Sequence, residues 1–104
     1  MVLSVVVFKE NKGYVAQCLE FDIAAQGTTE KKAMESIVKI ISGQIKLDVK
    51  YGKEPFAGIE RAPERYWDLF IKKAKPVQKK RPIFLPKDVP YDVRATAEFA
   101  VASC

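Results

Sequence analysis

The sequence predicts a single α+β domain with a small antiparallel sheet and the element order β-β-β-α-(α)-β. Three stretches carry this prediction. Residues 2–9 are dense in β-branched side chains, residues 30–51 repeat apolar side chains every three or four positions, and residues 91–102 alternate apolar and polar side chains. Strands joined by short turns and followed by a helical repeat are typical of an antiparallel sheet with helices packed on it.

The composition is that of a globular chain. A length of 104 residues normally makes one compact domain, and the 48% hydrophobic and 30% charged fractions are far from those of disordered chains. The longest early apolar run, residues 2–8, is interrupted by Ser4, lacks a basic leader and is too short for a membrane span or a signal-peptide core. We therefore expect a cytoplasmic protein with no membrane contact.

The first elements are predicted to be strands. Residues 2–9 carry apolar groups on both faces, which indicates a central strand covered on two sides. Asn11 and Gly13 in the following stretch ENKG tolerate the positive φ of a short hairpin turn with a bulge. Residues 14–21 return as a second strand, and residues 23–27 predict a third strand or edge segment that ends at Gly27. The second strand alternates between two faces, with Val15, Leu19 and Phe21 on one and Tyr14, Ala16 and Cys18 on the other.

A long amphipathic helix is predicted next. Thr29 is placed as its N-cap, and Glu30 suits the positive end of the helix dipole. The helix can run to about Tyr51 with Gly52 as its stop, although Gly43 weakens the interior by roughly 1 kcal/mol relative to alanine. Its apolar positions share one wide arc and are Ala33, Met34, Ile37, Val38, Ile40, Ile41, Ile45 and Leu47.

The second half predicts a shorter helix, a connector and a final strand. Residues 62–75, APERYWDLFIKKAK, have a proline in the first turn and lysines near the other end. The four prolines of residues 75–90 predict an extended connector, with a short edge strand around residues 83–85 as an alternative. Residues 91–102 predict a strand. The packing stripe of the shorter helix would be Tyr66, Trp67, Phe70 and Ala74.

Several classes of chemistry lack the residues that they need. The chain has no histidine, which removes the Ser-His and Cys-His nucleophile systems and the commonest zinc ligand. The five glycines are too scattered for a phosphate-binding loop. Cys18 and Cys104 stand at no metal-ligand spacing and are expected to be free thiols, with Cys18 packed among apolar neighbours. We expect no cofactor, no metal and no enzymatic activity.

The stretch GYVAQCLEFDIAAQGTTEKKA, residues 13–33, resembles the HicB family of antitoxin-like proteins, which pair with HicA toxins. Leu19 departs from the family pattern, since proline is common there, and so does Lys32, where the family often has the glutamate of a capping box. The resemblance covers roughly the first half of the chain and, in the order of elements, the final strand. The matching positions are Gly13, Tyr14, Ala16, Cys18, Glu20, Gly27, Thr29 and Ala33.

The resemblance implies a partial RNase H-like fold, that is, a three-stranded meander, a helix packed on it and a further strand, without a catalytic set. It implies a non-catalytic antitoxin that neutralises a HicA-type RNase toxin by protein-protein contact. Self-association into a dimer or higher oligomer is expected on family grounds and because a small open sheet leaves hydrogen-bonding edges. Typical HicB antitoxins add a C-terminal DNA-binding module, whereas residues 91–102 predict a strand, so short stand-alone HicB-like proteins are the closer resemblance. Residues 1–104 then form one domain in which residues 53–90 are an insertion that carries the second helix and the connector.

Glu20 and Asp22 are the only paired carboxylates with a candidate role. Two residues apart in a strand, they would share a face, as the metal-binding carboxylates of a true RNase H-like enzyme do. No third acid is tied to them by spacing, so solvated strand-end carboxylates are favoured over a vestigial nuclease. Because HicA-type toxins are small and basic, we expect a sheet edge or the acids Glu20, Asp22 and Glu30 to contact the partner.

A basic tract is the strongest signal outside the core. Six cations and no acid lie within ten residues: Lys72, Lys73, Lys75, Lys79, Lys80 and Arg81. The other residues hold twelve cations and thirteen acids, so all of the excess positive charge is local. A solvated helix end and connector is the favoured interpretation. The alternative is a nucleic-acid-binding accessory protein, or docking of an acidic partner, through this tract, with nucleic-acid binding that is weak, non-specific and salt-sensitive.

Overall fold

The computed structural model describes residues 1–83 and 95–102, and for residues 73–82 and 95 it describes the backbone only. Residues 91–94 of the predicted final strand, residues 84–85 of the alternative edge strand and Cys104 lie outside the described residues. The α+β class is confirmed. The elements are strands β1 (Val2–Glu10), β2 (Gly13–Cys18) and β3 (Ala24–Gly27), helices α1 (Glu30–Lys50) and α2 (Glu64–Asp68), the π-helix η1 (Leu69–Lys73), and strands β4 (Ala74–Ile83) and β5 (Ala95–Ala102).

The strands form one mixed sheet in the order β3-β2-β1-β5-β4. β1 pairs antiparallel with β2, β2 with β3, and β4 with β5. β1 and β5 run parallel, with Val5 beside Phe99. The sequence had predicted an antiparallel sheet. This prediction is wrong for the β1-β5 pair, which makes the sheet mixed. The long connection through α1, α2 and β4 lets β5 enter beside β1 in the same direction, which a tight hairpin cannot do.

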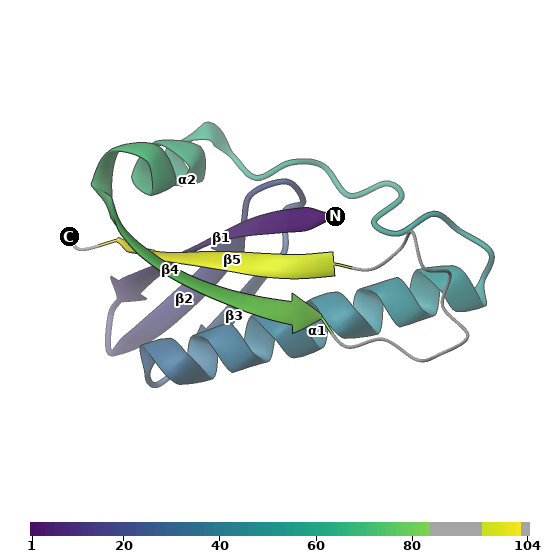
Figure 1. The fold of residues 1–104 in the computed structure, drawn as a ribbon, viewed down its shortest axis with the longest axis horizontal. Coiled ribbons are helices and arrows are strands. Elements are labelled where there is room, and N and C mark those ends of the chain that lie inside the picture. The colour runs from purple at the N-terminus through teal and green to yellow at the C-terminus, as the bar shows by residue number, and fades with distance from the viewer. Residues whose placement is uncertain (84–94, 103–104) are drawn as a thin grey trace.

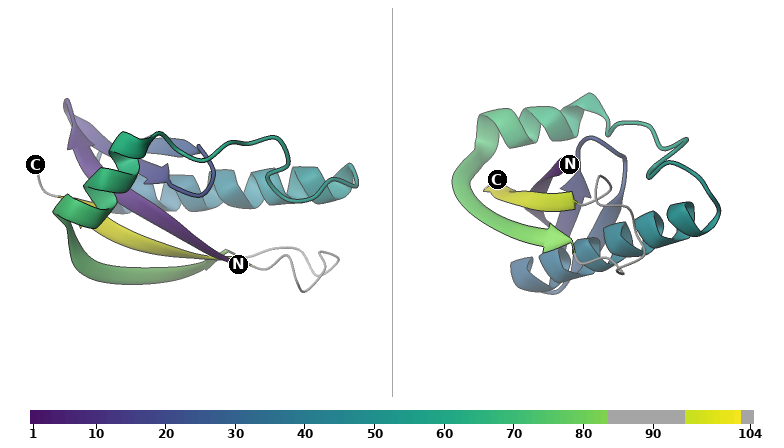
Figure 2. Two further views of the ribbon diagram at one scale, coloured as in Figure 1. Left: turned by 90° about the horizontal axis from the view of Figure 1, so that it is seen from above. Right: turned by 45° about the vertical axis from the view of Figure 1, so that its right-hand side comes forward.

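β1 lies in the middle of the sheet, and both of its faces are covered, as predicted. Leu3, Val5 and Val7 belong to the core cluster that includes the buried side chains of α1. Val6 and Phe8 belong to a second cluster on the opposite face, against α2 and η1. Figure 1 and Figure 2 show the resulting three layers, with α1 on one side of the sheet and the α2 segment on the other.

The β1-β2 hairpin is short, as predicted, but Glu10 pairs directly with Gly13, so its turn has two residues and lacks the predicted bulge. Its glycine also has a different role. Asn11 adopts φ 54°, as its place in the turn predicted. Gly13 pairs with Glu10 and is not among the residues with positive φ. A Cβ at Gly13 would lie 2.9 Å from the carbonyl oxygen of Gly27 on β3. Gly13 is thus required by the close approach of two strands and not by backbone conformation.

The junction between β3 and α1 is tighter still. A Cβ at Gly27 would lie 2.3 Å from the backbone nitrogen of Ala33 and 2.7 Å from the carbonyl carbon of Lys32. The first turn of α1 therefore packs directly against the end of β3. Thr29 is the N-cap, as predicted, and its side-chain oxygen accepts the N–H of Lys32 at 3.1 Å.

Helix α1 buries most of its predicted apolar arc, but one flank is exposed. The buried apolar side chains are Ala33, Met34, Ile37, Ile41 and Ile45. Ile40 and Leu47, predicted to belong to the arc, are 46% and 50% exposed. Leu47 follows Ile40 by seven positions, and the exposed Tyr51 follows Ile40 by eleven. These spacings place the three side chains on one side of the helix axis. Gly52, at φ 68°, stops the helix as predicted.

A turn after α1, which the sequence analysis did not predict, adds to the core. Asp48 is 6% exposed, and its carboxylate accepts the N–H of Phe56 at 2.8 Å and the side-chain amide of Gln44 at 3.1 Å. Phe56 adopts φ 65°, which is unusual for a bulky residue. Its ring is stacked on Phe21 with the centroids 4.2 Å apart. Asp48 thus holds this loop so that a strained phenylalanine fills the core.

The predicted second helix is shorter than expected and passes through η1 into a strand. Tyr66, Trp67 and Phe70 pack on the sheet as predicted, whereas Ala74 begins β4. The extended connector predicted from residue 75 onward is instead this edge strand, which ends at Ile83. Pro76 and Pro82 are compatible with it because an edge strand needs hydrogen-bond donors on one side only.

Strand β5 confirms the predicted alternation over residues 95–102. Ala97 and Phe99 are buried in the cluster beneath α1, and Ala102 is buried in the cluster beneath α2. None of the helices in the described part of the chain combines the length and the apolarity that a bilayer crossing requires.

Candidate interaction surfaces

Glu20 replaces a missing bond of the sheet. The N–H of Leu19 donates to the carbonyl of Ser4 at 2.9 Å, which continues the β1-β2 ladder, but the carbonyl of Leu19 accepts the N–H of Ala62 instead of that of Ser4. The Ser4 N–H donates to Glu20 Oε1 at 2.7 Å. The Glu20 carboxylate therefore completes the end of the ladder, and its role is in the first place structural.

Asp22 holds the bend that follows. Its Oδ1 accepts from the side-chain amide of Gln17 at 2.9 Å, and its backbone N–H donates to the carbonyl of Glu60 at 2.7 Å. Gln17 is 3% exposed, so Asp22 satisfies a buried polar group. Among the described residues, no group of three or more acidic or cysteine side chains is arranged to hold a metal ion.

Cys18 is a packed thiol, as predicted. It is fully buried in the cluster beneath α1 and forms no disulfide. Burial raises the pKa of the Cys18 thiol to about 11, and the negative charge of Glu20, whose Oε1 lies 4.0 Å from Sγ, acts in the same direction. A thiol that keeps its proton at neutral pH and has no contact with solvent is a poor nucleophile.

The structure brings Glu20 and Asp22 to one end of β3 and Glu30 to the other. β3 runs antiparallel to β2, with Gln17 beside Ala24 and Tyr14 beside Gly27. Asp22 precedes β3, and Glu30 follows it in the first turn of α1, where it is exposed. The three predicted contact residues therefore do not form one cluster. Asp22 and Glu30 flank β3, the edge strand of the sheet, whereas the Glu20 carboxylate is directed toward β1.

The basic tract lies at the opposite edge of the sheet. Lys75, Lys79, Lys80 and Arg81 are residues of β4, whose only partner in the described sheet is β5. The β4-β5 register shifts between Lys75 and Lys79. Lysines, prolines and a bulge are the features with which edge strands avoid pairing with other chains. This composition explains the tract without a ligand.

Two arginines next to the tract rest on aromatic rings. The guanidinium carbon of Arg61 lies 4.3 Å from the centroid of the Trp67 ring, and that of Arg65 lies 4.7 Å from the Tyr66 ring. Arg65 also donates to the Tyr66 hydroxyl at 3.0 Å, and this bond is the main cause that raises the pKa of Arg65. These arginines were not predicted as functional residues, although an arginine beside Tyr-Trp is a visible signal in the sequence.

Lys72 is the one tract residue whose side chain the structure describes. It is exposed, and its Nζ lies 3.8 Å from Oδ1 of Asp68, which is one helical turn earlier.

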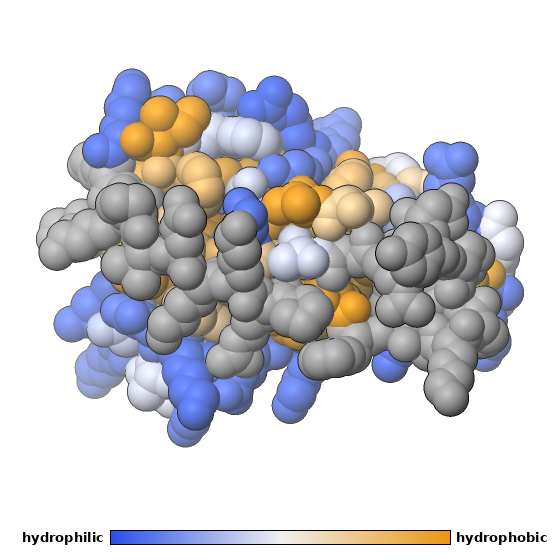
Figure 3. Space-filling view, in the orientation of Figure 1, coloured by the Kyte–Doolittle hydropathy of each residue, from blue (hydrophilic) through white to orange (hydrophobic). Residues whose placement is uncertain are grey.

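Figure 3 shows hydrophilic atoms along the lower edge of the molecule, over α1, and a group of apolar atoms at the upper left, over the α2 segment. Ile71 in that segment is 70% exposed.

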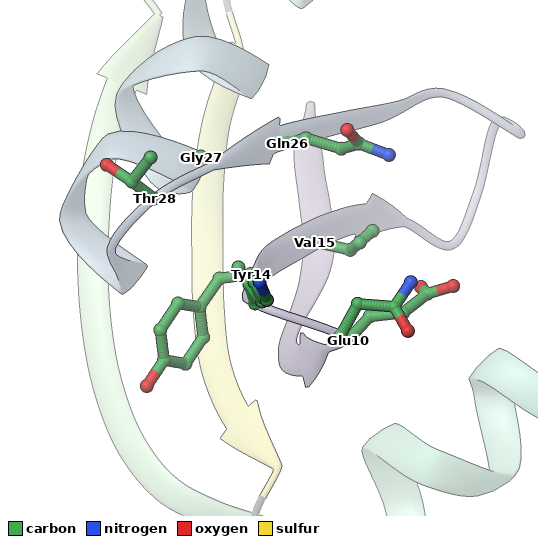
Figure 4. A pocket seen from close by; sticks show the side chains of 9 residues that line it. Glu10, Tyr14, Val15, Gln26, Gly27 and Thr28 are labelled. Atoms are coloured by element: carbon green, nitrogen blue, oxygen red, sulfur yellow. The ribbon is translucent and has the colours of Figure 1, made fainter.

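A shallow depression of about 430 Å³ lies where the β1-β2 turn meets the end of β3. Figure 4 shows Glu10, Val15 and Gln26 on one side of the strands and Tyr14 pointing to the other. No buried polar side chain in the described part of the molecule lacks a hydrogen-bond partner. Most side chains that line the depression are exposed, so it is an open feature of the surface.

Comparisons of the chain with models of protein families, with curated proteins and with solved structures find no match.

Proposed function

We propose that the chain is a non-catalytic HicB-like protein of the antitoxin type, acting in the cytoplasm, which neutralises a HicA-type RNase toxin by protein-protein contact. The observation that carries the proposal is that the residues matching the family pattern have structural roles in this fold. Gly27 admits the helix, Thr29 caps it, Cys18 is packed and Glu20 completes the sheet ladder. These residues hold a scaffold in place, which suits a binding protein better than an enzyme.

The arrangement of elements also supports the proposal. A meander of β1, β2 and β3 is followed by α1 packed on one of its faces, and a further strand lies beside β1. The resemblance in residues 13–33 implies this order. The acids at the β3 edge would face a small basic toxin and cover it, so that RNA is excluded.

Co-expression with a HicA-type toxin encoded beside this gene tests the proposal. Growth should recover, and the two proteins should purify together. Charge reversal of Asp22 and Glu30 to lysine should weaken both effects, while Glu54→Lys, a reversal at an exposed acid beyond the far end of α1, should not. Absence of both rescue and co-purification with the unaltered chain would contradict the antitoxin proposal.

A second candidate function, nucleic-acid binding, is favoured by the Arg61-Trp67 and Arg65-Tyr66 pairs. Residues 61–81 carry eight cations and two acids, so the net charge of this segment, 8 − 2 = +6, exceeds that of the whole chain, +5. Aromatic rings and guanidinium groups beside a basic strand offer stacking and phosphate contacts to a single strand.

A gel-shift titration with single-stranded RNA separates the two candidates. Binding should weaken steeply with salt and fall further when Lys79, Lys80 and Arg81 are replaced by glutamine. The matched control replaces the helical lysines Lys39, Lys46 and Lys50, which removes the same charge elsewhere. Equal losses from both triple variants would contradict a site on β4.

The proposal includes self-association into a dimer or higher oligomer. The exposed stripe of Ile40, Leu47 and Tyr51 supports it, because large apolar side chains in line on one helix favour contact with another surface. Sedimentation velocity should show Leu47→Lys shifted toward the monomer. An unaltered monomer at all concentrations would refute this part of the proposal.

A further inference from the structure

We propose that the outer edge of β3 receives an extended, basic segment of the partner protein, which adds to the sheet as a further strand. This inference rests on the proposed function and specifies where and through which chemistry the partner is held.

The backbone groups at this edge point outward. The N–H of Cys18 donates to the carbonyl of Ile23 at 2.9 Å, so Cys18 and Ile23 occupy a hydrogen-bonded position of the β2-β3 ladder, although the N–H of Ile23 donates to the carbonyl of Phe21. Such pairs alternate with non-bonded pairs along an antiparallel ladder. Ala24 and Gln26, opposite Gln17 and Val15, therefore occupy non-bonded positions. Their N–H and C=O groups face away from β2.

The edge is accessible within the described part of the chain. Ala24 and Gln26 are exposed, whereas Ala25 between them is buried toward α1. No strand of the described sheet pairs with the outer side of β3. The strand carries no proline and no charge of its own, so it lacks the features that protect β4. A peptide with alternating donors and acceptors can therefore pair with it.

The charge at this edge selects the partner. Residues 13–30 contain no cation, and two of their three acids, Asp22 and Glu30, are exposed; Lys12 and Lys31 directly flank this range. Asp22 and Glu30 lie just beyond the two ends of β3. A strand laid along this edge would place its own end residues near these carboxylates, which favours lysine or arginine there.

A second copy of this chain fits the edge poorly. Antiparallel pairing of β3 with β3 of another copy would bring Asp22 of one copy close to Glu30 of the other, and like charges across a strand pair destabilise it. Pairing with the basic β4 of another copy meets Pro76, Pro82 and the register shift. The acidic edge therefore indicates a basic segment from a different protein.

Amide hydrogen exchange, followed by NMR on the isotope-labelled full chain, tests the inference directly. The probe is a short peptide of alternating lysine and valine, and the control probe alternates glutamate and valine. The basic peptide should slow exchange of the Ala24 and Gln26 amides by about tenfold or more at saturation. The acidic peptide should leave them unchanged. Slowing at β4, or at neither edge, would overturn the inference.

A pair of variants at one exposed position isolates the backbone contribution. Gln26→Pro removes an outward N–H, whereas Gln26→Ala removes the side chain and keeps that N–H. Affinity for the basic peptide should fall about tenfold in the first and stay within about twofold in the second. Equal affinities in both would overturn the inference. If Gln26→Pro does not fold, the exchange measurement on the unaltered chain still decides.

The outcome is separable from that of the proposed function. Slowed exchange at Ala24 and Gln26 with the basic peptide, without neutralisation of the toxin, would support peptide binding at the β3 edge and refute the antitoxin function. A toxin that co-purifies while both amides exchange as in the free protein would support the antitoxin function and refute binding at the β3 edge. Protection of these amides that rises with protein concentration and without any peptide would identify a second copy as the occupant and overturn the inference.

Discussion

Replacing each of two glycines with alanine should have opposite effects on stability. At Gly27 the new Cβ would lie 2.3 Å from the backbone nitrogen of Ala33, whereas ordinary contact begins near 3.4 Å. The first turn of α1 must therefore move away by about 1 Å, and close-packed interiors resist such shifts. We expect Gly27→Ala to lower the free energy of unfolding by about 3 kcal/mol, the upper part of the range for overpacked sites.

At Gly43 the same substitution meets nothing within 4 Å. Gly43 lies in the interior of α1, where alanine is favoured over glycine by roughly 1 kcal/mol. For a domain of this size, 1 kcal/mol corresponds to a shift of about 4–8 °C in Tm. Gly43→Ala should therefore raise Tm by a few degrees, and Gly27→Ala should lower it by roughly three times as much.

Thermal unfolding followed by circular dichroism measures both variants, and urea titration gives the free energies. A wild-type Tm for Gly27→Ala would show that β3 and α1 do not approach as closely as described. Loss of stability in Gly43→Ala would show that this side of α1 is covered.

Three further predictions concern buried polar groups and the packed thiol. Glu20→Ala should cost about 1–3 kcal/mol in urea unfolding because the Ser4 N–H loses its acceptor, while Glu20→Gln, which keeps an acceptor oxygen, should cost less; equal losses would contradict the bond. Asp48→Ala should cost at least as much and should speed amide exchange at Phe56, whose N–H it leaves unpaired; unchanged exchange would argue against the turn described. The pKa of Cys18 is raised from 9.0 to about 11, so the unfolded chain releases this proton first and stability falls as pH rises through that window. Cys18→Ala should remove that part of the fall, measured as the difference between the two pH profiles, and parallel profiles would refute it.

Local signals in the sequence predicted the elements that local chemistry determines. Asn11 in the turn, Thr29 at the helix start and the spacing of Ile37, Ile41 and Ile45 each depend on neighbours within one turn. The parallel pairing of β1 with β5 depends on contacts between distant parts of the chain, and no local spacing specifies it. β4 was missed for a related reason, because prolines and lysines are typical of connectors and also of edge strands.

The candidate surfaces were predicted as residues but not as arrangements. Glu20 and Asp22 were identified from their spacing, yet the role of Glu20 depends on the N–H of Ala62 occupying the carbonyl of Leu19. That contact links distant parts of the sequence. The separation of Glu30 from these two acids follows from the direction of β3, which the sequence does not specify on its own.

The position of β1 between β2 and β5 has a consequence during synthesis. On the ribosome β1 emerges before the other described elements and β5 after all of them, so one side of a valine-rich strand stays unpaired while the rest of the chain is made. An open strand of high β-propensity is a site for aggregation. A chain interrupted before residue 95 would keep that side open, and its abundance in the cell would depend on chaperones more than that of the complete fold.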